Sequence, residues 1–318
     1  VGIHPDVEVV IAPVLAARPG FDATYKIVYR NKGNRTFSEG MIALEYQDEL
    51  LDFVATSQPL ASQTTGNLSW QYTNLLPFES RVILLTLNVN SPTETPPVNN
   101  GQLLNFMATV TPTDIDEHTA DNTFEYKQRV VGSYDPNDIA CLEGDSVAPS
   151  EIGKYLHYAI NFENMGTFHA ENIVVRTEVD TTRFNMQSLQ LMDTSHPVHA
   201  RIEGNVAEFV FEHINLDIGG HGHILLKIKT LESLNVGDAV AKRADIFFDY
   251  NYPIDTGLAN TVFETLSNSE FDADASVAIS PNPAHTEVVV KADNNIKSIQ
   301  VYDVQGRIIA TSLIQNTE

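Results

Sequence analysis

Short stretches in which apolar and polar residues alternate recur along the whole chain. They are rich in Val, Ile, Tyr, Phe and Thr, and they include residues 23–29, 82–89, 155–162, 206–211 and 224–228. A period of two is typical of a strand with one face toward a core. Helical spacing of apolar residues is almost absent, and Gly, Pro, Asn and Asp interrupt the chain throughout. The pattern therefore predicts an all-β protein built from β-sandwiches.

An internal repeat predicts how many sandwiches there are. The sequence YKIVYRNKG of residues 25–33 returns as YAINFENMG in residues 158–166. The similarity continues in residues 68–72 and 207–211, and an Asn-Leu pair follows each of these two segments. Such a repeat predicts two copies of one domain. We expect tandem immunoglobulin-like sandwiches in residues 1–131 and 132–267.

The repeated Asn-x-Gly element is interpreted as a turn at the end of a strand. We expect Gly to supply a positive φ and Asn to hydrogen-bond the neighbouring backbone. Between the copies, residues 130–138 read VVGSYDPND, in which Gly, Ser and Pro interrupt the strand pattern. This predicts a short, stiff connector with the two sandwiches end to end.

Charge and composition exclude several classes of protein. The chain has 42 acidic and 19 basic residues, a formal net charge of -23 that repels nucleic acids and anionic lipid surfaces. The single cysteine, Cys141, excludes a disulfide within the chain and a cysteine-based zinc cluster. The sequence contains no apolar run long enough to span a membrane. Residues 1–8 lack the features of a signal peptide. The sequence is thus expected to be a mature chain or an internal fragment.

The C-terminal part contains two motifs of a known export signal. Residues 277–284 read VAISPNPA, and residues 299–309 read IQVYDVQGRII. They resemble the type A C-terminal sorting domain of the type IX secretion system, whose members share a Pro-Asn-Pro start and a Tyr-Asp-x-x-Gly-Arg turn. The motif residues are Pro281, Asn282, Pro283, Tyr302, Asp303, Gly306 and Arg307.

This resemblance implies a small β-sandwich that the type IX secretion machinery recognises as its partner. It also implies that the protein is secreted, either into the medium or onto the cell surface. Because the family pattern normally continues for a few more strands, residues 268–318 are expected to be a linker and a partial sorting domain.

The two repeats have resemblances of their own. Residues 132–265, with GSYDPND near the start and ADIFFDYNYP near the end, resemble an uncharacterised domain common just before that sorting domain. Residues 17–22, ARPGFD, and the first Asn-x-Gly strand are similar to the immunoglobulin-like modules that bacterial surface proteins string together as stalks. Neither resemblance implies a known activity.

No cofactor is expected, although one acidic segment offers possible ligands for calcium. Residues 114–121, DIDEHTAD, are the densest acidic segment. Oxygen ligands from Asp114, Asp116 and Asp121, joined by Asp135, would suit Ca²⁺ between the domains. Because the pattern is not that of an EF-hand, we expect a solvated acidic loop, with calcium as the alternative.

Two further residue types invite a binding interpretation. The histidine pairs at 196 and 199 and at 221 and 223 are expected in flexible surface loops, with zinc as the alternative. Trp70, the only tryptophan, is expected in the core, with a sugar-stacking platform as the alternative.

Catalytic motifs are missing from the sequence. It contains no Gly-x-Ser-x-Gly elbow, no His-Glu-x-x-His pair and no Gly-rich phosphate loop. We therefore expect a non-enzymatic structural or adhesive module outside the cell, which could be a subunit or stalk of a surface assembly. Its partners could be other copies of itself, surface proteins or glycans. The alternative is a glycan-binding accessory module of a larger secreted hydrolase.

Overall fold

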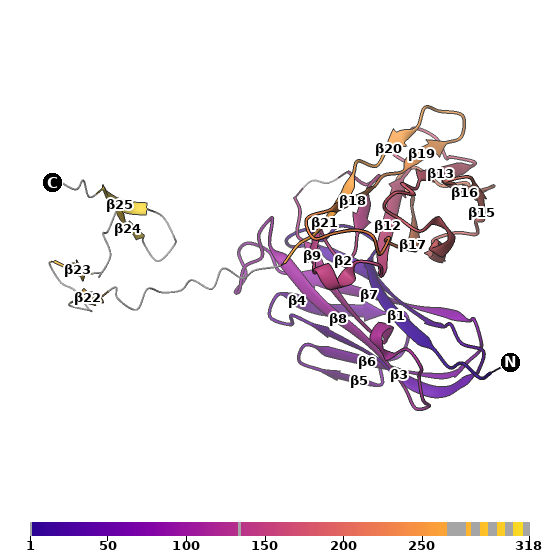
Figure 1. Cartoon of the computed structure of the whole chain (residues 1–318), viewed down its shortest axis with the longest axis horizontal. Helices are drawn as coiled ribbons and strands as arrows, with labels where there is room; N and C mark the ends of the chain where they lie inside the picture. Colours follow the sequence, from indigo (N-terminus) through magenta and orange to yellow (C-terminus); the bar gives the residue numbers. More distant parts are fainter. Residues whose placement is uncertain are drawn as a thin grey trace. The chain divides into compact units, whose positions relative to one another are not determined.

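The computed structural model describes residues 2–132, 135–265, 278–280, 287–291, 298–302 and 308–313. These residues form strands and three short 3-10 turns, which confirms the all-β prediction (Figure 1). The turns are η1 (Thr119–Asp121), η2 (Pro149–Glu151) and η3 (Met186–Ser188). The chain divides into two compact units, Val1–Leu266 and Ser267–Glu318.

The first sandwich has a four-stranded and a five-stranded sheet. The four-stranded sheet has the order β1 (Val7–Pro13), β2 (Asp22–Asn31), β7 (Ser80–Val89), β4 (Leu51–Thr56). The five-stranded sheet has the order β5 (Ser62–Thr64), β6 (Asn67–Leu75), β3 (Phe37–Tyr46), β8 (Leu103–Pro112), β9 (Thr123–Arg129). Rings from both sheets meet in the core, where the centroids of Tyr25 and Phe106 lie 4.7 Å apart. Trp70 is buried in this core, as the sequence predicts, and its ring N–H donates to Thr56 Oγ1.

The second sandwich repeats these two sheets. Its four-stranded sheet has the order β10 (Ile139–Cys141), β12 (Tyr155–Glu163), β17 (His221–Lys229), β14 (Gln190–Thr194). Its five-stranded sheet has the order β15 (His199–Glu203), β16 (Val206–Phe211), β13 (Ile173–Glu178), β19 (Asp245–Phe248), β20 (Ile254–Asp255). A further three-stranded sheet has the order β11 (Ser146–Val147), β21 (Ala259–Phe263), β18 (Ala239–Lys242). Phe162 packs against Phe211 and Phe248 across the core, with centroids 5.3 Å and 6.5 Å away.

The repeated Asn-x-Gly element has the same hydrogen bonds in both sandwiches. Asn31 Nδ2 donates to the carbonyls of Arg35 and Leu75, and its Oδ1 accepts from Gly33 N. Asn164 Nδ2 donates to the carbonyls of Phe168 and Leu216, and its Oδ1 accepts from Gly166 N. Leu75 and Leu216 belong to the two Asn-Leu pairs of the repeat. Each buried asparagine therefore ties a loop that crosses between the sheets to a second segment, the end of β6 in the first sandwich and the β16–β17 connection in the second.

The glycines of this element act differently from the expectation. Neither Gly33 nor Gly166 has a positive φ, so the predicted role of left-handed backbone is wrong. At Gly33 the requirement is space, because a Cβ would lie 2.2 Å from the carbonyl oxygen of His4. The N-terminal segment thus passes directly over this turn.

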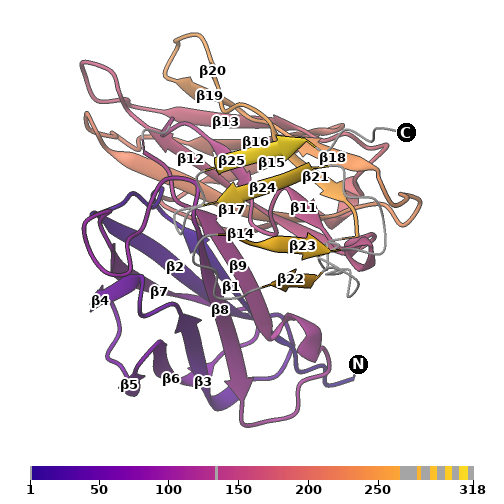
Figure 2. The ribbon, with the colours of Figure 1, turned by 90° about the vertical axis from the view of Figure 1, so that its left-hand side faces the viewer.

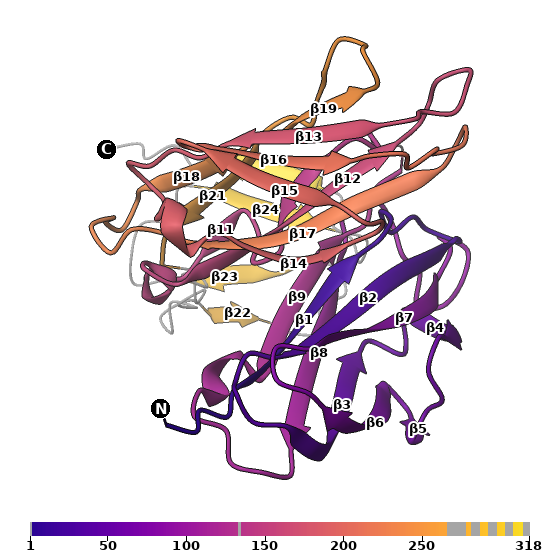
Figure 3. The ribbon, with the colours of Figure 1, turned by 90° about the vertical axis from the view of Figure 1, so that its right-hand side faces the viewer.

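The two sandwiches pack face to face instead of end to end. Strands β1 and β2 of the first sandwich lie against β12, β17 and β14 of the second (Figures 2 and 3), whereas Leu84 on β7 stays 42% exposed. Buried side chains of the second sandwich, among them Ala159 and Leu225, belong to the core cluster of the first. Strands β1 and β17 are consequently buried on both faces. The domain boundary between residues 131 and 132 stays a prediction, because one compact unit contains both sandwiches.

The second unit contains two antiparallel strand pairs. β22 (Ala278–Ser280) pairs with β23 (Val289–Lys291), and β24 (Ser298–Tyr302) pairs with β25 (Ile308–Leu313). Tyr302 lies opposite Ile308 at the end of the second pair. The other six predicted sorting-motif residues lie outside the described residues.

Candidate functional site

The contact between the sandwiches, which we call the joint, is organised around a buried ion pair. Lys227 Nζ on β17 donates to Glu8 Oε2 on β1, and each residue is only 2% exposed. Lys227 also lies over the Tyr155 ring, 4.7 Å from its centroid. Breaking one partner of such a pair is costly because it leaves the other charge buried and alone. The pair therefore specifies how the two sheets are placed against each other.

A second polar cluster lies in the same joint. Lys26 Nζ on β2 lies 2.6 Å from Asp193 Oδ2 on β14 and 2.7 Å from His223 Nε2 on β17. Burial raises the pKa of Asp193, but hydrogen bonds from His223 and Lys26 outweigh it and hold the pKa below the usual value. Burial lowers the pKa of nearby His196, and the charges of His223 and Lys26 lower it further. The cluster therefore favours a charged carboxylate and a neutral His196.

Apolar side chains fill the joint between these clusters. Val10 and Val28 from the first sandwich and Leu225 and Met192 from the second are all buried in one cluster. The Phe124 ring on β9 packs edge-on against His157 on β12, with centroids 5.0 Å apart. Together, the apolar contacts and the ion pairs cross-link two sheets on either side of the connector.

Sequence reasoning missed the joint, although a signal was present. Residues 9–12 and 224–226 are uninterrupted apolar runs within strands that otherwise alternate. Such runs are typical of strands buried on both faces. Glu8 directly precedes the first of these runs, and Lys227 directly follows the second. Their pairing cannot be predicted from the sequence, because it depends on how the two sheets pack.

The predicted calcium ligands have separate partners in the structure. Asp114 pairs with Arg35 at 3.3 Å, and Asp121 accepts a hydrogen bond from Lys32. Asp116 accepts from the backbone N–H groups of Val7 and His118, and Asp135 from that of Asn137.

Within residues 2–132 and 135–265, and in the strands described beyond them, no group of three or more His, Cys, Asp or Glu side chains has the arrangement of a metal site. Calcium binding by Asp114, Asp116, Asp121 and Asp135 therefore stays a proposal, which a calcium titration of the secreted protein tests.

The histidines of the zinc interpretation belong to other arrangements. His223 is buried in the joint, whereas His221 pairs with Glu163 at 3.4 Å. His196 Nδ1 lies 2.8 Å from Ser195 Oγ, and His199 is exposed on the edge strand β15. These contacts leave zinc without support from the described geometry.

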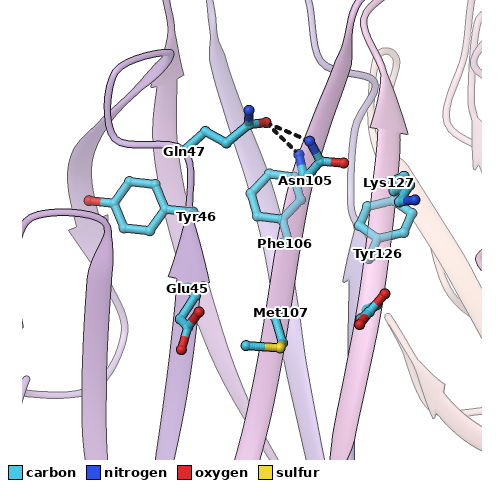
Figure 4. A pocket seen from close by; sticks show the side chains of 9 residues that line it. Glu45, Tyr46, Gln47, Asn105, Phe106, Met107, Tyr126 and Lys127 are labelled. Atoms are coloured by element: carbon cyan, nitrogen blue, oxygen red, sulfur yellow. Dashed lines mark hydrogen bonds between the residues drawn. The ribbon is translucent and has the colours of Figure 1, made fainter. Parts of the chain in front are cut away.

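Two shallow depressions mark the outer faces of the five-stranded sheets. One lies over β3, β8 and β9, where Gln47 Oε1 accepts from Asn105 N and Nδ2 beside Met107 and Lys127 (Figure 4). The other lies over β13, β15 and β16, where Arg201 and Arg176 both pair with Glu208.

Burial raises the pKa of the only thiol, Cys141, well above its usual value, which makes it a poor nucleophile.

Comparison with known families identifies an export signal in the C-terminal part of the chain. Residues 278–318 match the family described as "Secretion system C-terminal sorting domain". The chain carries a secretion-system sorting domain. This confirms the type IX assignment, and the protein is exported to the cell exterior or surface. In the part of the chain that the structure describes, no helix has the length and apolar character needed to span a bilayer.

The second sandwich coincides with another family. Residues 135–262 match the family described as "Domain of unknown function (DUF7619)". No curated protein matches the chain.

Several solved β-sandwich proteins are similar in part. The C-terminal domain of the Streptococcus pyogenes antigen I/II-family protein AspA is 7% identical, with 82% of this chain and 99% of that one covered at a TM-score of 0.31. The collagen adhesin from S. aureus is 12% identical, with coverages of 82% and 92% and a TM-score of 0.28. A CARDB domain from Pyrococcus furiosus, solved with di-metal ions, is 20% identical, with coverages of 40% and 90% and a TM-score of 0.28. At these scores the similarities say nothing about what the exported chain binds.

Proposed function

We propose that the exported chain is a non-enzymatic structural or adhesive module, in which the two sandwiches act as one rigid unit next to the sorting domain. The joint is the observation that supports this proposal. Neighbouring domains move relative to each other unless their interface is large and apolar. Here β1 and β2 are buried against β12, β14 and β17, with the Glu8–Lys227 pair inside. A rigid unit of this kind suits a spacer or a platform for surface loops.

The surface chemistry supports binding more than catalysis. The two depressions are open and lie on the outer faces of sheets, where water is not excluded. Enzyme sites and small-molecule sites are concave and enclose most of the ligand. Partners would therefore meet loops or sheet edges.

The glycan-binding alternative gains no specific support. A row of exposed aromatic side chains along a sheet face would favour it. The most exposed aromatic side chains of the described sandwiches, Tyr250 and Tyr252, lie in a loop instead.

The test compares three kinds of cells, which export the normal chain, export the Glu8→Ala variant or lack the chain. We expect removal of the chain to reduce adhesion or disturb the surface layer, and the Glu8→Ala variant to reproduce that loss at equal export. Small-angle scattering of the secreted protein measures whether the variant has become flexible. Normal adhesion and surface structure in cells that lack the chain would contradict the proposal.

A further inference from the structure

Three loops at one end of the second sandwich expose large apolar side chains. They connect β12 to β13, β16 to β17 and β19 to β20, and they project from the same end of the sandwich (Figures 2 and 3). Their exposed side chains, which we call the loop-end patch, are Met165 (69%), Phe168 (70%), Ile218 (62%), Tyr250 (104%) and Tyr252 (96%). Scattered apolar residues are normal on a surface, but a group of this size in adjacent loops indicates an interaction site.

Hydrogen bonds hold the bases of the three loops together. Asp249 accepts from the backbone N–H groups of Asn172 (2.7 Å) and Glu171 (3.3 Å). Asn172 Oδ1 accepts from His213 N at 3.0 Å. Asn164 O accepts from Gly219 N at 2.8 Å. The side chains of the patch therefore stand on a fixed base, which lowers the entropy lost on binding.

The first sandwich provides an internal comparison. Its five-stranded sheet has the same strand order, so the connection from β8 to β9 corresponds to the one from β19 to β20. The β8–β9 connection contains Asp114 and Asp121, which pair with Arg35 and Lys32 of the β2–β3 loop. Ion pairs thus hold the base of this connection, although Ile115 within it is 80% exposed. Exposed tyrosines at the same place in the second sandwich are not required by the fold.

The patch lies away from the place where the chain leaves the sandwich. β19 ends at Phe248, opposite Ile173 at the patch end. β21 runs in the other direction, and Val262 lies opposite Ala239 at the far end. The patch and the end of β21 therefore lie at opposite ends of the second sandwich.

Acidic side chains surround the patch. The three loops contain no Lys or Arg, and Glu171, Glu212 and Asp217 are exposed in them. A second copy of this acidic chain would be repelled. The charge instead complements a surface rich in Lys and Arg.

We propose that the loop-end patch is a protein-docking surface whose partner is an extracellular protein with an apolar patch bordered by Lys and Arg. This inference rests on the adhesive role proposed above and names its partner class. Tyr and Met are enriched in protein interfaces, and Tyr is a frequent hot spot. The aliphatic side chains Met165 and Ile218 suit an apolar protein surface, because they offer no flat ring for stacking on a sugar.

The test uses the full secreted protein with a photo-crosslinking residue at position 252. This protein is added to the producing cells and crosslinked by light. The crosslinked protein is identified by mass spectrometry and purified, and its affinity for the normal chain is measured. We expect Tyr250→Ser combined with Tyr252→Ser to weaken binding by about tenfold or more. High salt should slow association because the charges are complementary. The matched control is Leu76→Ser combined with Phe78→Ser, which removes exposed apolar residues from the corresponding β6–β7 loop of the first sandwich and should leave affinity unchanged.

Four outcomes would overturn the inference. They are no crosslinked protein, equal affinity of the patch variant and the normal chain, crosslinking only to another copy of the chain, and binding that survives protease treatment of the cells but is competed by their polysaccharide. The patch variant should unfold like the normal chain. Rigidity of the joint is measured separately by scattering, so the two proposals can fail independently.

Discussion

Lys242 is the buried residue whose surroundings suit its charge least. Its Nζ is buried without a hydrogen-bond partner, between the rings of Tyr158 and Phe184 at 5.7 Å and 5.2 Å. Burial lowers the pKa of Lys242 to about 8 from an ordinary value of 10.5. The aromatic faces offset part of the cost of burying the ammonium, but they do not replace a hydrogen bond.

Replacing this lysine by an apolar side chain should stabilise the protein. We expect Lys242→Met to raise the free energy of unfolding at pH 7 by about 1–3 kcal/mol, because it removes an unpaired buried charge. The measurement is urea unfolding. Lys127→Met, at an exposed position, is the control and should change stability by less than about 0.5 kcal/mol. A loss of stability in Lys242→Met would show that the ammonium has a favourable partner.

The same residue predicts a rise of stability with pH. Between pH 8 and 10.5 the folded chain loses the Lys242 proton while the unfolded chain keeps it, so unfolding becomes less favourable as pH increases. The full difference corresponds to roughly 3 kcal/mol. Unfolding measured from pH 7 to 9.5 should show the beginning of this rise in the normal chain. A rise that persists in Lys242→Met would assign it to another group.

The two clamping asparagines make a second prediction at the scale of residues. Asn164→Ala should lower the free energy of unfolding by about 1–3 kcal/mol, because the Phe168 carbonyl and the Gly166 N–H group lose their partner, while the Leu216 carbonyl keeps its bond from Ala170 N. Asn31→Ala should have an effect of similar size, since its three hydrogen bonds are equivalent. Thermal and urea unfolding measure both, with the exposed Asn235→Ala as control. A marked difference between the two would mean that the repeats are not energetically equivalent.

At the scale of elements, β1, β12 and β17 are unusual because each is buried on both faces. Val9 and Ile11 point into one core, whereas Glu8 and Val10 lie in the joint. The alternation of a strand normally separates core from solvent. Here it separates two different interiors, and in the joint Glu8 Oε2 accepts from Lys227 while Asp193 accepts from Lys26.

A double-mutant cycle measures how β1 and β17 are coupled. Glu8→Leu alone should cost about 3–5 kcal/mol because it leaves Lys227 charged and buried alone, and Lys227→Met alone should be costly because it leaves Glu8 buried alone. Glu8→Leu with Lys227→Met should be close to the normal chain in stability, since both charges are removed together. Additive effects of the single changes would contradict the close pairing seen in the structure.

At the scale of the whole molecule, the joint should make two sandwiches unfold as one. Trp70 reports only on the first sandwich, whereas far-ultraviolet circular dichroism reports on both. We expect the two signals to follow one transition in the normal chain. In Glu8→Ala they should separate. Separate transitions in the normal chain would mean that the joint does not couple the sandwiches.

Acid should loosen the joint in two steps. The lowered pKa of His196 favours the neutral ring in the folded chain, so stability is lost as pH falls below about 6.5, the usual value. The lowered pKa of Asp193 adds a second loss below about 4. Urea unfolding between pH 7.5 and 5 measures the first step, and His196→Gln should flatten it. An unchanged slope in that variant would exclude His196 as its source.

The strands, the two repeats and the export signal could all be predicted from the amino-acid sequence. Alternation along a strand, the Asn-x-Gly turn and the sorting motifs depend on residues close together in the chain, so their physical meaning is local. The Asn clamps were visible as a repeat, although the reason for their glycines was not, because the approach of His4 to Gly33 is a tertiary contact.

The way in which the sandwiches meet, and the end that exposes aromatic side chains, depend on tertiary packing and could not be predicted from the sequence. Glu8 and Lys227 are 219 residues apart, and no spacing rule relates them until two sheets have closed on each other. Likewise, Asp114 and Asp121 looked like free ligands until Arg35 and Lys32 were placed beside them. Buried charge is compatible with folding only when a partner is near, and nearness in space is set by the packing of the sheets rather than by the order of the residues.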